Sequence, residues 1–396
     1  MVGTGLTTDL MSITGIGAVT GYGWGRETLW EGLLSGVPAA RFEPGYGLDP
    51  TTGGWVALVP DDGAATGADG TRYGRAVLAA VAEAVADAQD RGWSPGPRVG
   101  LVNAAVLGDV RHWLAFSGPG GTDFRGRDFL RLLPSTPVSV VNQAFGFTGP
   151  VIGVSAACSS ANVAMVQAQL WFAAGLVDDV VCVASDLSAT PELVRQFCAL
   201  GAAVVDTESL DGCRPFQEGS RGFSVGEAAV AFVLTRDPVP AYATVLGGAM
   251  NNEAHHVVSL EPSHDRVVEC VRLALADAGV DAADIRYLNA HGTGTAQCDR
   301  AERDLLTRVF ADRPAVYSIK PLAGHCQAAS GAVELAAAAL GYERGVIPAP
   351  PAVAPAHHRM LDGATAAEPG LTAKLSLGMG GNNSMVVLAP GSHAAA

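Results

Sequence analysis

Residues 153–165 read GVSAACSSANVAM, and a change from strand to helix inside them decides the fold class. The apolar run at 151–156 predicts a short strand, and residues 160–174 predict a helix that follows almost at once. A strand that passes directly into a helix is the building unit of α/β proteins with buried sheets. The same alternation continues on both sides, with strands predicted at 12–20, 98–105, 180–184 and 228–234 and helices at 26–35 and 75–89.

The sequence also repeats itself weakly. Residues 159–175 (SSANVAMVQAQLWFAAG) align with 329–345 (ASGAVELAAAALGYERG), and the helix and strand at 75–105 recur at 266–290. The helix-and-strand segment and the alanine-rich helix are separated by more residues in the first half of the chain than in the second. Extra residues are therefore expected in the first half, in the Gly- and Arg-rich segment 117–131. The repeat predicts two similar α/β halves, 11–239 and 240–390. Chance likeness between alanine-rich helices is the alternative.

Composition narrows the classes of function. The chain has 396 residues, 48% of them hydrophobic and 16% charged, which is enough apolar material for a large core and excludes a disordered protein. Its net charge of −14 argues against non-specific binding of nucleic acid. Of the 25 basic residues only Lys320 and Lys374 are lysines, so a lysine here is expected to serve a chemical purpose.

The cysteine pattern predicts neither a disulfide framework nor a metal site. There are 7 cysteines, an odd number, and none forms a CxxC pair. A reduced cytoplasmic compartment fits this pattern. We find no signal peptide at the start of the chain and no apolar run of the roughly 20 residues that a membrane helix needs, so no membrane association is expected.

Cys158 is the first candidate for chemistry. It stands between the predicted strand and helix, where the positive end of the helix dipole is expected to lower the pKa of its thiol and favour the thiolate. Small residues after it allow a tight turn and an approachable sulfur. A buried structural cysteine is the alternative, and we treat the other six cysteines in that way.

Three further segments place polar groups at strand ends. NAHGTGT (289–295) delivers His291 after a predicted strand, and ligands of open α/β sheets bind at such ends. SIKPLAGH (318–325) places Lys320 and His325 just before a helix, and SLGMGGNNS (376–384) is a Gly-rich turn that can bring backbone N–H groups close to a ligand. One cysteine, two histidines and a lysine together form a set that suits nucleophilic catalysis.

With these motifs in hand, the sequence resembles a β-ketoacyl synthase, a condensing enzyme of the thiolase superfamily. The ACSS, HGTGT, KPLAGH and GMGGNN segments occur in the family's order, and CRPFQEGSRGFSVGEAA at 213–229 and DRAE at 299–302 agree as well. The resemblance covers about residues 11–390. It implies a thiolase fold in which the duplicated α/β halves form five layers, αβαβα.

The resemblance also implies roles for the motif residues. Cys158 would accept an acyl chain from a carrier thioester, and His291 and His325 would stabilise the enolate that forms when a malonyl extender loses its carboxylate. Lys320 would hold the local charge network, with Glu302 as its supporting carboxylate or, in the plainer reading, as its partner in a structural ion pair. No metal or organic cofactor is needed.

Further positions follow from the same resemblance. The backbone N–H groups of Cys158 and Met379 would form the oxyanion hole, with Gly378 beside Met379 in the gate turn, and the substrate would meet the side chains of Thr293, Thr295 and Asn383.

The gate turn departs from the family's usual pattern. Leu377 and Met379 stand where aromatic residues are usual, and Asn382 replaces a usual threonine. Because methionine is flexible and unbranched, we expect an acyl entrance of different shape. These departures favour a specialised polyketide or fatty-acid pathway.

The implied partner is an acyl carrier protein. Such carriers are usually acidic, so a chain of charge −14 needs a local basic patch, and Arg125, Arg127 and Arg131 are one candidate, with a solvated loop as the alternative. The resemblance favours a homodimer and leaves a heterodimer open.

Two other functions compete with condensation. One is a non-condensing acyltransferase of the same fold that uses Cys158. The other is a non-catalytic subunit that sets chain length in a heterodimer, against which the presence of Cys158 argues.

Overall fold

The computed structural model describes residues 10–61, 71–118, 125–205 and 208–391. Its centre is one 11-stranded sheet: ten strands from both halves of the chain form a continuous series, and the short β2 (Gly23–Trp24) pairs off this series with the first strand of the chain. The strands of the first half lie in the order β6 (Val151–Val154), β5 (Val99–Ala104), β7 (Asp179–Asp186), β9 (Ala228–Thr235) and β1 (Met11–Thr20). Those of the second half are β12 (Ala315–Tyr317), β11 (Ile285–Asn289), β15 (Leu371–Gly378), β16 (Asn382–Pro390) and β10 (Ala243–Asn252).

Each half arranges its five principal strands in the same way. Numbered along the chain within its own half, each set has the spatial order 3-2-4-5-1. The two sets meet where β1 pairs antiparallel with β10 through residues 11–13 and 243–245. Within each half the strands numbered 2, 3 and 4 are parallel, while strand 5 runs antiparallel to its neighbours. The shared order explains the sequence repeat, and the exact limits at residues 239 and 240 remain a prediction.

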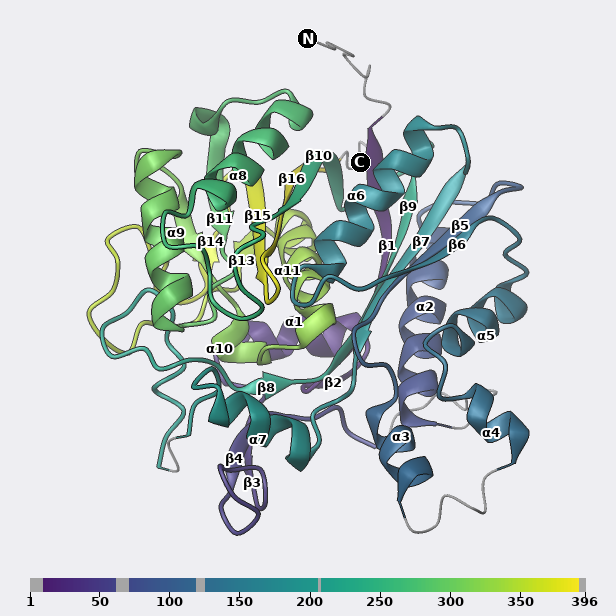
Figure 1. The fold of residues 1–396 in the computed structure, drawn as a ribbon. Coiled ribbons are helices and arrows are strands. Elements are labelled where there is room, and N and C mark those ends of the chain that lie inside the picture. Colours follow the sequence, from purple (N-terminus) through teal and green to yellow (C-terminus); the bar gives the residue numbers. More distant parts are fainter. Residues whose placement is uncertain (1–9, 62–70, 119–124, 206–207, 392–396) are drawn as a thin grey trace.

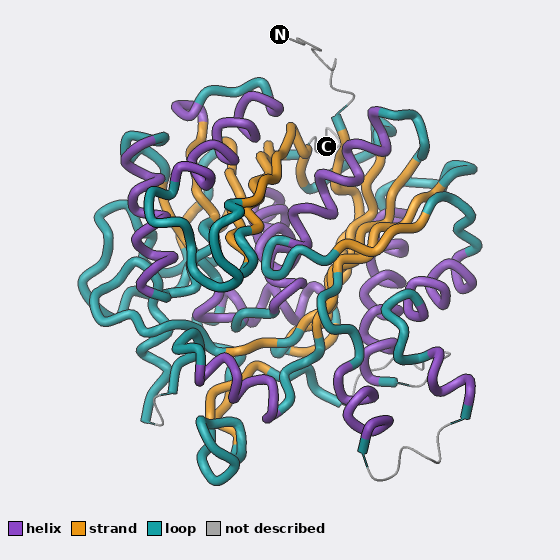
Figure 2. Tube along the Cα trace, in the orientation of Figure 1, coloured by secondary structure: helices purple, strands orange, loops and turns teal. Residues whose placement is uncertain are grey.

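Helices complete five layers. The central layer holds α6 (Ser160–Ala173) and α11 (Ser330–Arg344), which contact strands of both halves. The outer layers hold α2 (Arg72–Asp90) and α5 (Thr136–Phe145) on the first half, and α8 (Asp265–Ala278) and α9 (Ala296–Arg308) on the second. Figure 1 shows these helices on either side of the two sheet halves, and Figure 2 shows the same alternation by type of structure. The predicted α/β fold with αβαβα layers is confirmed.

The pattern of burial distinguishes the central helices from the outer ones. α11 is buried from Ser330 to Gly341 on all of its faces, which is typical of a helix packed between the two halves of the sheet. α2 instead has one apolar face, and it packs on β1 over glycines: a Cβ on Gly17 would collide with the Ala80 carbonyl oxygen. The strand glycines therefore set how closely this outer helix can approach.

The extra residues of the first half lie where the repeat predicted them. Between β5 and β6 the chain forms α3 (Val110–Ser117), α4 (Gly126–Leu130) and α5. Part of the predicted segment, residues 119–124, lies outside the described residues.

Shorter elements border the core. They are β2 (Gly23–Trp24), α1 (Arg26–Leu34), β3 (Arg41–Glu43), β4 (Gly54–Ala57), α7 (Pro191–Ala199), β8 (Val225–Gly226), α10 (Lys320–Ala323), β13 (Val346–Ile347) and β14 (Thr365–Ala366). Within the described ranges, no helix is both long and apolar enough to cross a membrane. All 7 cysteines are free thiols.

Candidate active site

Cys158 lies in a tight turn between β6 and α6. Ala157 before it has a φ of 49°, in the left-handed region, and this reversal lets α6 begin at Ser160. Ser160 fixes the turn: its Oγ accepts the Ala156 N–H at 2.8 Å and donates to the Ala157 carbonyl oxygen at 2.7 Å. The sequence therefore places the thiol at the amino end of a central helix, as predicted.

The direction predicted for the pKa of Cys158 is wrong. The residue is 5% exposed, and burial raises the pKa of its thiol to about 11. The Lys320 ammonium and a hydrogen bond from the Met379 backbone N–H act in the opposite direction without overcoming burial. The unliganded protein therefore holds a protonated thiol at neutral pH, because loss of water costs the thiolate more than the nearby positive charges return.

The two histidines come from different loops of the second half. His291 follows β11, and His325 follows α10. Both are almost fully buried, and their ring centroids lie 5.8 Å apart in an edge-to-face arrangement. Phe223 packs on His325, with 4.5 Å between the ring centroids.

The proton of His325 can be assigned to Nε2. The backbone N–H of Gln327 donates to Nδ1 at 3.1 Å, so Nδ1 carries a lone pair. The Ser330 hydroxyl lies 2.7 Å from the same atom and can donate to it as well. In a neutral imidazole the other nitrogen then holds the proton. His325 is therefore a fixed Nε2–H donor.

Both histidines are held neutral. Burial lowers the pKa of His291 and of His325 well below its usual value, and the positive charge of Lys320 lowers each further. Lys374 acts in the same direction on both. A neutral imidazole can donate one hydrogen bond without bringing a charge into the site.

Lys320 supports His291 through the backbone. Its Nζ donates to the His291 carbonyl oxygen, while Glu302 accepts the N–H groups of His291 at 2.7 Å and of Gly292 at 2.9 Å. The ion-pair partner of Lys320 is Glu334 of α11, with 2.5 Å between Nζ and Oε1. The expectation that Glu302 pairs with Lys320 is corrected: Glu302 instead holds the loop of His291.

Glu334 was missed from the sequence. It lies on an alanine-rich helix, where one buried acid is indistinguishable from an exposed one. Its spacing of 14 residues from Lys320 gives no local signal, because the contact depends on how α11 packs.

The gate turn between β15 and β16 lies against the turn of Cys158. Ser159 joins the two, since its Oγ is within hydrogen-bond distance of the carbonyl oxygens of Ser376 (3.1 Å) and Asn382 (2.5 Å). Gly378 allows the close approach, because a Cβ there would lie 2.7 Å from the Ala156 carbonyl oxygen. This contact brings the Met379 N–H to the sulfur.

We expect Gly378→Ala to destabilise the protein by about 1–3 kcal/mol, because the added methyl must push the gate turn away from the Cys158 turn. Chemical denaturation measures the change. Gly126→Ala is the matched control, since a Cβ there meets nothing within 4 Å. Equal stability of the Gly378→Ala variant and the wild type would contradict this account of the turn.

These groups open into one cavity of about 320 Å³. Cys158, His291 and His325 line it together. Thr293 and Thr295 line it as well, and their hydroxyl oxygens are 3.0 Å apart. Its other lining residues from the predicted set are Leu377, Gly378 and Met379.

Apolar residues from several loops complete the cavity and were not predicted. They are Leu200, Phe223, Val258 and Leu260. They come from loops distant in sequence, so only the fold brings them together.

Asn383 lies away from the lining of this cavity. Its side chain is buried, and its Nδ2 donates to Asn251 Oδ1 at 3.2 Å and Glu253 Oε1 at 3.4 Å. This placement gives the expected contact with substrate no support. Among the residues that the structure describes, no group of three or more His, Cys, Asp or Glu is arranged to hold a metal ion.

Comparison with known proteins gives two family matches. The model described as β-ketoacyl synthase, N-terminal domain, matches residues 10–239, and the C-terminal domain model matches residues 242–353. Nodulation protein E of Rhizobium meliloti (strain 1021) is 30% identical over 356 residues, 85% of this chain and 87% of that protein. The tetracenomycin polyketide synthase ketoacyl synthase alpha subunit of Streptomyces glaucescens is 32% identical over 363 residues, 85% of each chain.

Solved structures share the fold. The ishigamide ketosynthase/chain length factor has a TM-score of 0.83 at 23% identity, covering 96% of this chain and 99% of that one. A type II PKS acyl-carrier protein in complex with its ketosynthase bound to the hexaketide gives a TM-score of 0.82 at 22% identity, with the same coverage.

Proposed function

The chain belongs to the β-ketoacyl synthase family, and we propose that it catalyses decarboxylative condensation of an acyl group on Cys158 with a malonyl thioester on an acyl carrier protein. The observation that carries this proposal is the shared cavity: a thiol and two neutral imidazoles from both halves of the fold line the same space. A nucleophile and paired hydrogen-bond donors are what the two half-reactions require.

In the first half-reaction the Cys158 sulfur attacks the carbonyl carbon of an acyl thioester. The new C–S bond forms as the bond to the carrier sulfur breaks, and the thiol proton ends on the departing carrier thiol. The N–H groups of Cys158 and Met379 are proposed to receive the oxyanion, which is supported by the Met379 hydrogen bond to the sulfur. The same hydrogen bond lowers the pKa of the thiol and so opposes the effect of burial.

In the second half-reaction the malonyl group loses carbon dioxide. The electron pair of the broken C–C bond forms an enolate, whose oxygen accepts hydrogen bonds from His291 and from His325 Nε2–H. The enolate carbon attacks the Cys158 thioester, the C–S bond breaks, and the released Cys158 thiolate takes up a proton from solvent. The 3-ketoacyl product leaves on the carrier.

We place this condensation in a polyketide or specialised fatty-acid pathway. The named relatives include ketosynthases of polyketide assembly, and the gate residues Leu377 and Met379 both line the cavity. An aliphatic gate leaves a flexible wall beside the thiol, which would give the acyl entrance a shape different from that of an aromatic gate.

A test follows from the two half-reactions. The purified protein is incubated with acyl- and malonyl-carrier thioesters, and carbon dioxide release and product mass are followed. Condensation yields both carbon dioxide and a 3-ketoacyl carrier. Acyl transfer without carbon dioxide would instead identify the non-condensing acyltransferase.

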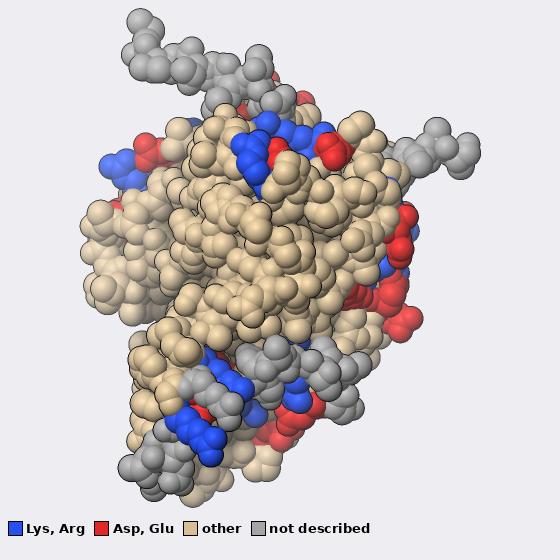
Figure 3. Space-filling model, turned by 90° about the vertical axis from the view of Figure 1, so that its right-hand side faces the viewer, with Lys and Arg blue, Asp and Glu red and all other residues tan. Residues whose placement is uncertain are grey.

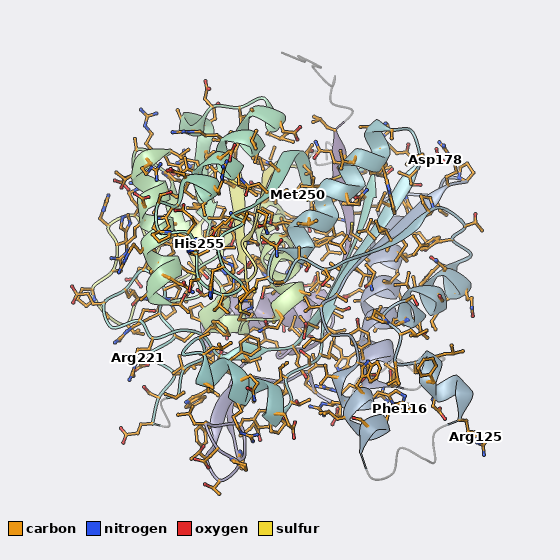
Figure 4. The ribbon with its side chains drawn as sticks, viewed as in Figure 1. Phe116, Arg125, Asp178, Arg221, Met250 and His255 are labelled. Atoms are coloured by element: carbon orange, nitrogen blue, oxygen red, sulfur yellow. The ribbon has the colours of Figure 1, made fainter. Side chains whose placement is uncertain are left out.

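Carrier docking is proposed to use arginine side chains of the first half. Arg131 pairs with Asp128 at 3.2 Å, whereas the Arg125 side chain is exposed at the outer end of α4 (Figure 4). We expect Arg125→Glu to weaken carrier binding several-fold, most at low salt. Binding is measured by titration against the carrier, with Arg272→Glu on exposed α8 surface as the control. Unchanged affinity would favour the solvated-loop interpretation.

A second subunit of the same fold is the other proposed partner. β6 is an edge strand of the large sheet, and its Val151 and Ile152 are 49% and 37% exposed. Figure 3, which faces this side of the molecule, shows a broad central area with few charged residues. An open strand edge under an uncharged surface suits pairing with another chain. Solved relatives include ketosynthase and chain length factor complexes, so a heterodimer is proposed beside a homodimer.

A further inference from the structure

The only two lysines of the chain meet on one buried carboxylate. Lys320 Nζ lies 2.5 Å from Glu334 Oε1, and Lys374 Nζ lies 2.8 Å from Glu334 Oε2. All three side chains are 1% exposed or less. Lys320 also donates to the His291 carbonyl oxygen, whereas the proposed mechanism gives Lys374 no task.

Lys374 is not needed to neutralise Glu334, because Lys320 already pairs with that carboxylate. Two ammonium groups on one carboxylate leave one positive charge in excess inside the protein, which is costly to bury. The other acid near Lys374 is Glu302 of α9, and burial raises the pKa of Glu302 to about 7. A cation retained at this cost calls for a reason in the chemistry of the neighbouring site.

The position of Lys374 gives that reason. It lies on β15, the strand that ends at the gate glycine Gly378, and its carbonyl oxygen accepts the side-chain N–H of Asn162 at 3.1 Å. Its Nζ also donates to the carbonyl oxygen of Leu375 on the same strand, so the charge is held on the gate strand beside α6, the central helix that begins at Ser160. Burial lowers the pKa of Lys374 to about 8, so the ammonium form still predominates at neutral pH.

We propose that Lys374 is a positioning residue: held by Glu334, it serves as a second buried cation that keeps His291 and His325 in their neutral, donating forms. The groups that face Lys374 are Glu334 of α11, Lys320 of α10 and Glu302 of α9. The charged groups that lower the pKa of both histidines are Lys320 and Lys374, and His325 also lowers the pKa of His291. The expected effect of Lys374 on the decarboxylation rate rests on the proposed condensation. Its effect on the protonation of the two histidines does not.

Neutrality matters most at His325. A proton on its Nδ1 would abolish the lone pair that accepts the Gln327 N–H and would turn a hydrogen bond into a clash of two donors. A nearby cation disfavours that protonation. Lys374 therefore protects the geometry in which Nε2–H is directed as donor.

The test replaces Lys374 with methionine or glutamine, which remove the charge at similar length. Removing a cation raises the pKa of both histidines. The pH below which the decarboxylation rate falls, called here the acid limb of the pH profile, is therefore expected to rise by roughly one pH unit. The protonation of the two imidazoles is followed in parallel by nuclear magnetic resonance of labelled histidine, which needs no substrate, and is expected to move by the same amount.

The double variant Lys374→Met with Glu334→Gln is the matched control. It leaves Lys320 as the single charge of the trio and so restores the original excess of one positive charge, which should return the acid limb towards its wild-type position. Unshifted imidazole protonation in the single variants, or equal loss of rate at every pH, would overturn the inference. Failure of the wild-type protein to release carbon dioxide would overturn the proposed function alone, because the resonance measurement still reports the charge effect.

Discussion

Replacing Cys158 with alanine is expected to abolish acyl loading. The side chain supplies a thiol that lines the cavity together with both histidines, and the Met379 N–H is directed at it; Cys298 supplies a second thiol to the lining. Without that sulfur no covalent intermediate can form, so the rate of condensation should fall to the uncatalysed background. Intact-mass measurement after incubation with an acyl carrier thioester detects the loss of the added acyl mass.

The same variant provides its own internal comparison. Release of carbon dioxide from a malonyl thioester depends on the histidine donors and not on the sulfur, so it should remain within about tenfold of the wild type. Cys298→Ala is the matched control for a second thiol on the same cavity, and it should load acyl groups normally. If loading persists in the Cys158→Ala protein, Cys158 is not the nucleophile.

The second large effect is expected at His325. Its replacement with alanine should slow decarboxylation by about 100- to 1,000-fold, because one preorganised donor to the enolate oxygen is lost. Acyl loading should fall much less, since it forms no enolate. Carbon dioxide release from the malonyl carrier and single-turnover acyl loading separate the two effects.

Two controls sharpen this prediction. His255→Ala removes a histidine that is exposed, and it should leave both half-reactions unchanged. Ser330→Ala removes the hydroxyl beside Nδ1 while the Gln327 N–H remains, so a smaller loss is expected. An equal loss of loading and decarboxylation in the His325→Ala protein would mean that the histidine serves the fold or the thiol rather than the enolate.

Much of the fold could be predicted because its signals are local. Strand-to-helix changes such as the one around Cys158 depend on residues within a few positions, and the repeated helix at 329–345 carries the same apolar spacing as its counterpart. The motif residues that line the cavity were likewise placed by their positions at strand ends. Asn383 shows the limit of this reasoning, since it belongs to the gate motif but contacts Asn251 and Glu253.

Electrostatics could not be predicted in the same way. The helix dipole at Cys158 is a local feature of the chain, whereas the burial that raises the pKa of the thiol results from packing of the gate turn and of distant loops over it. The helix argument alone therefore gave the wrong direction. The partner of Lys320 was assigned wrongly for the same reason.

By itself, the sequence predicted the alternation of strands and helices and the repeat, and it indicated Cys158, His291 and His325 as candidates for one site. Those features follow from patterns of neighbouring residues. Only the tertiary structure decided that Glu334 joins Lys320 to Lys374, because α11 packs between the two sheet halves and carries that carboxylate to both lysines. Ion pairs between buried groups depend on which surfaces meet, and that is fixed by packing across the whole molecule.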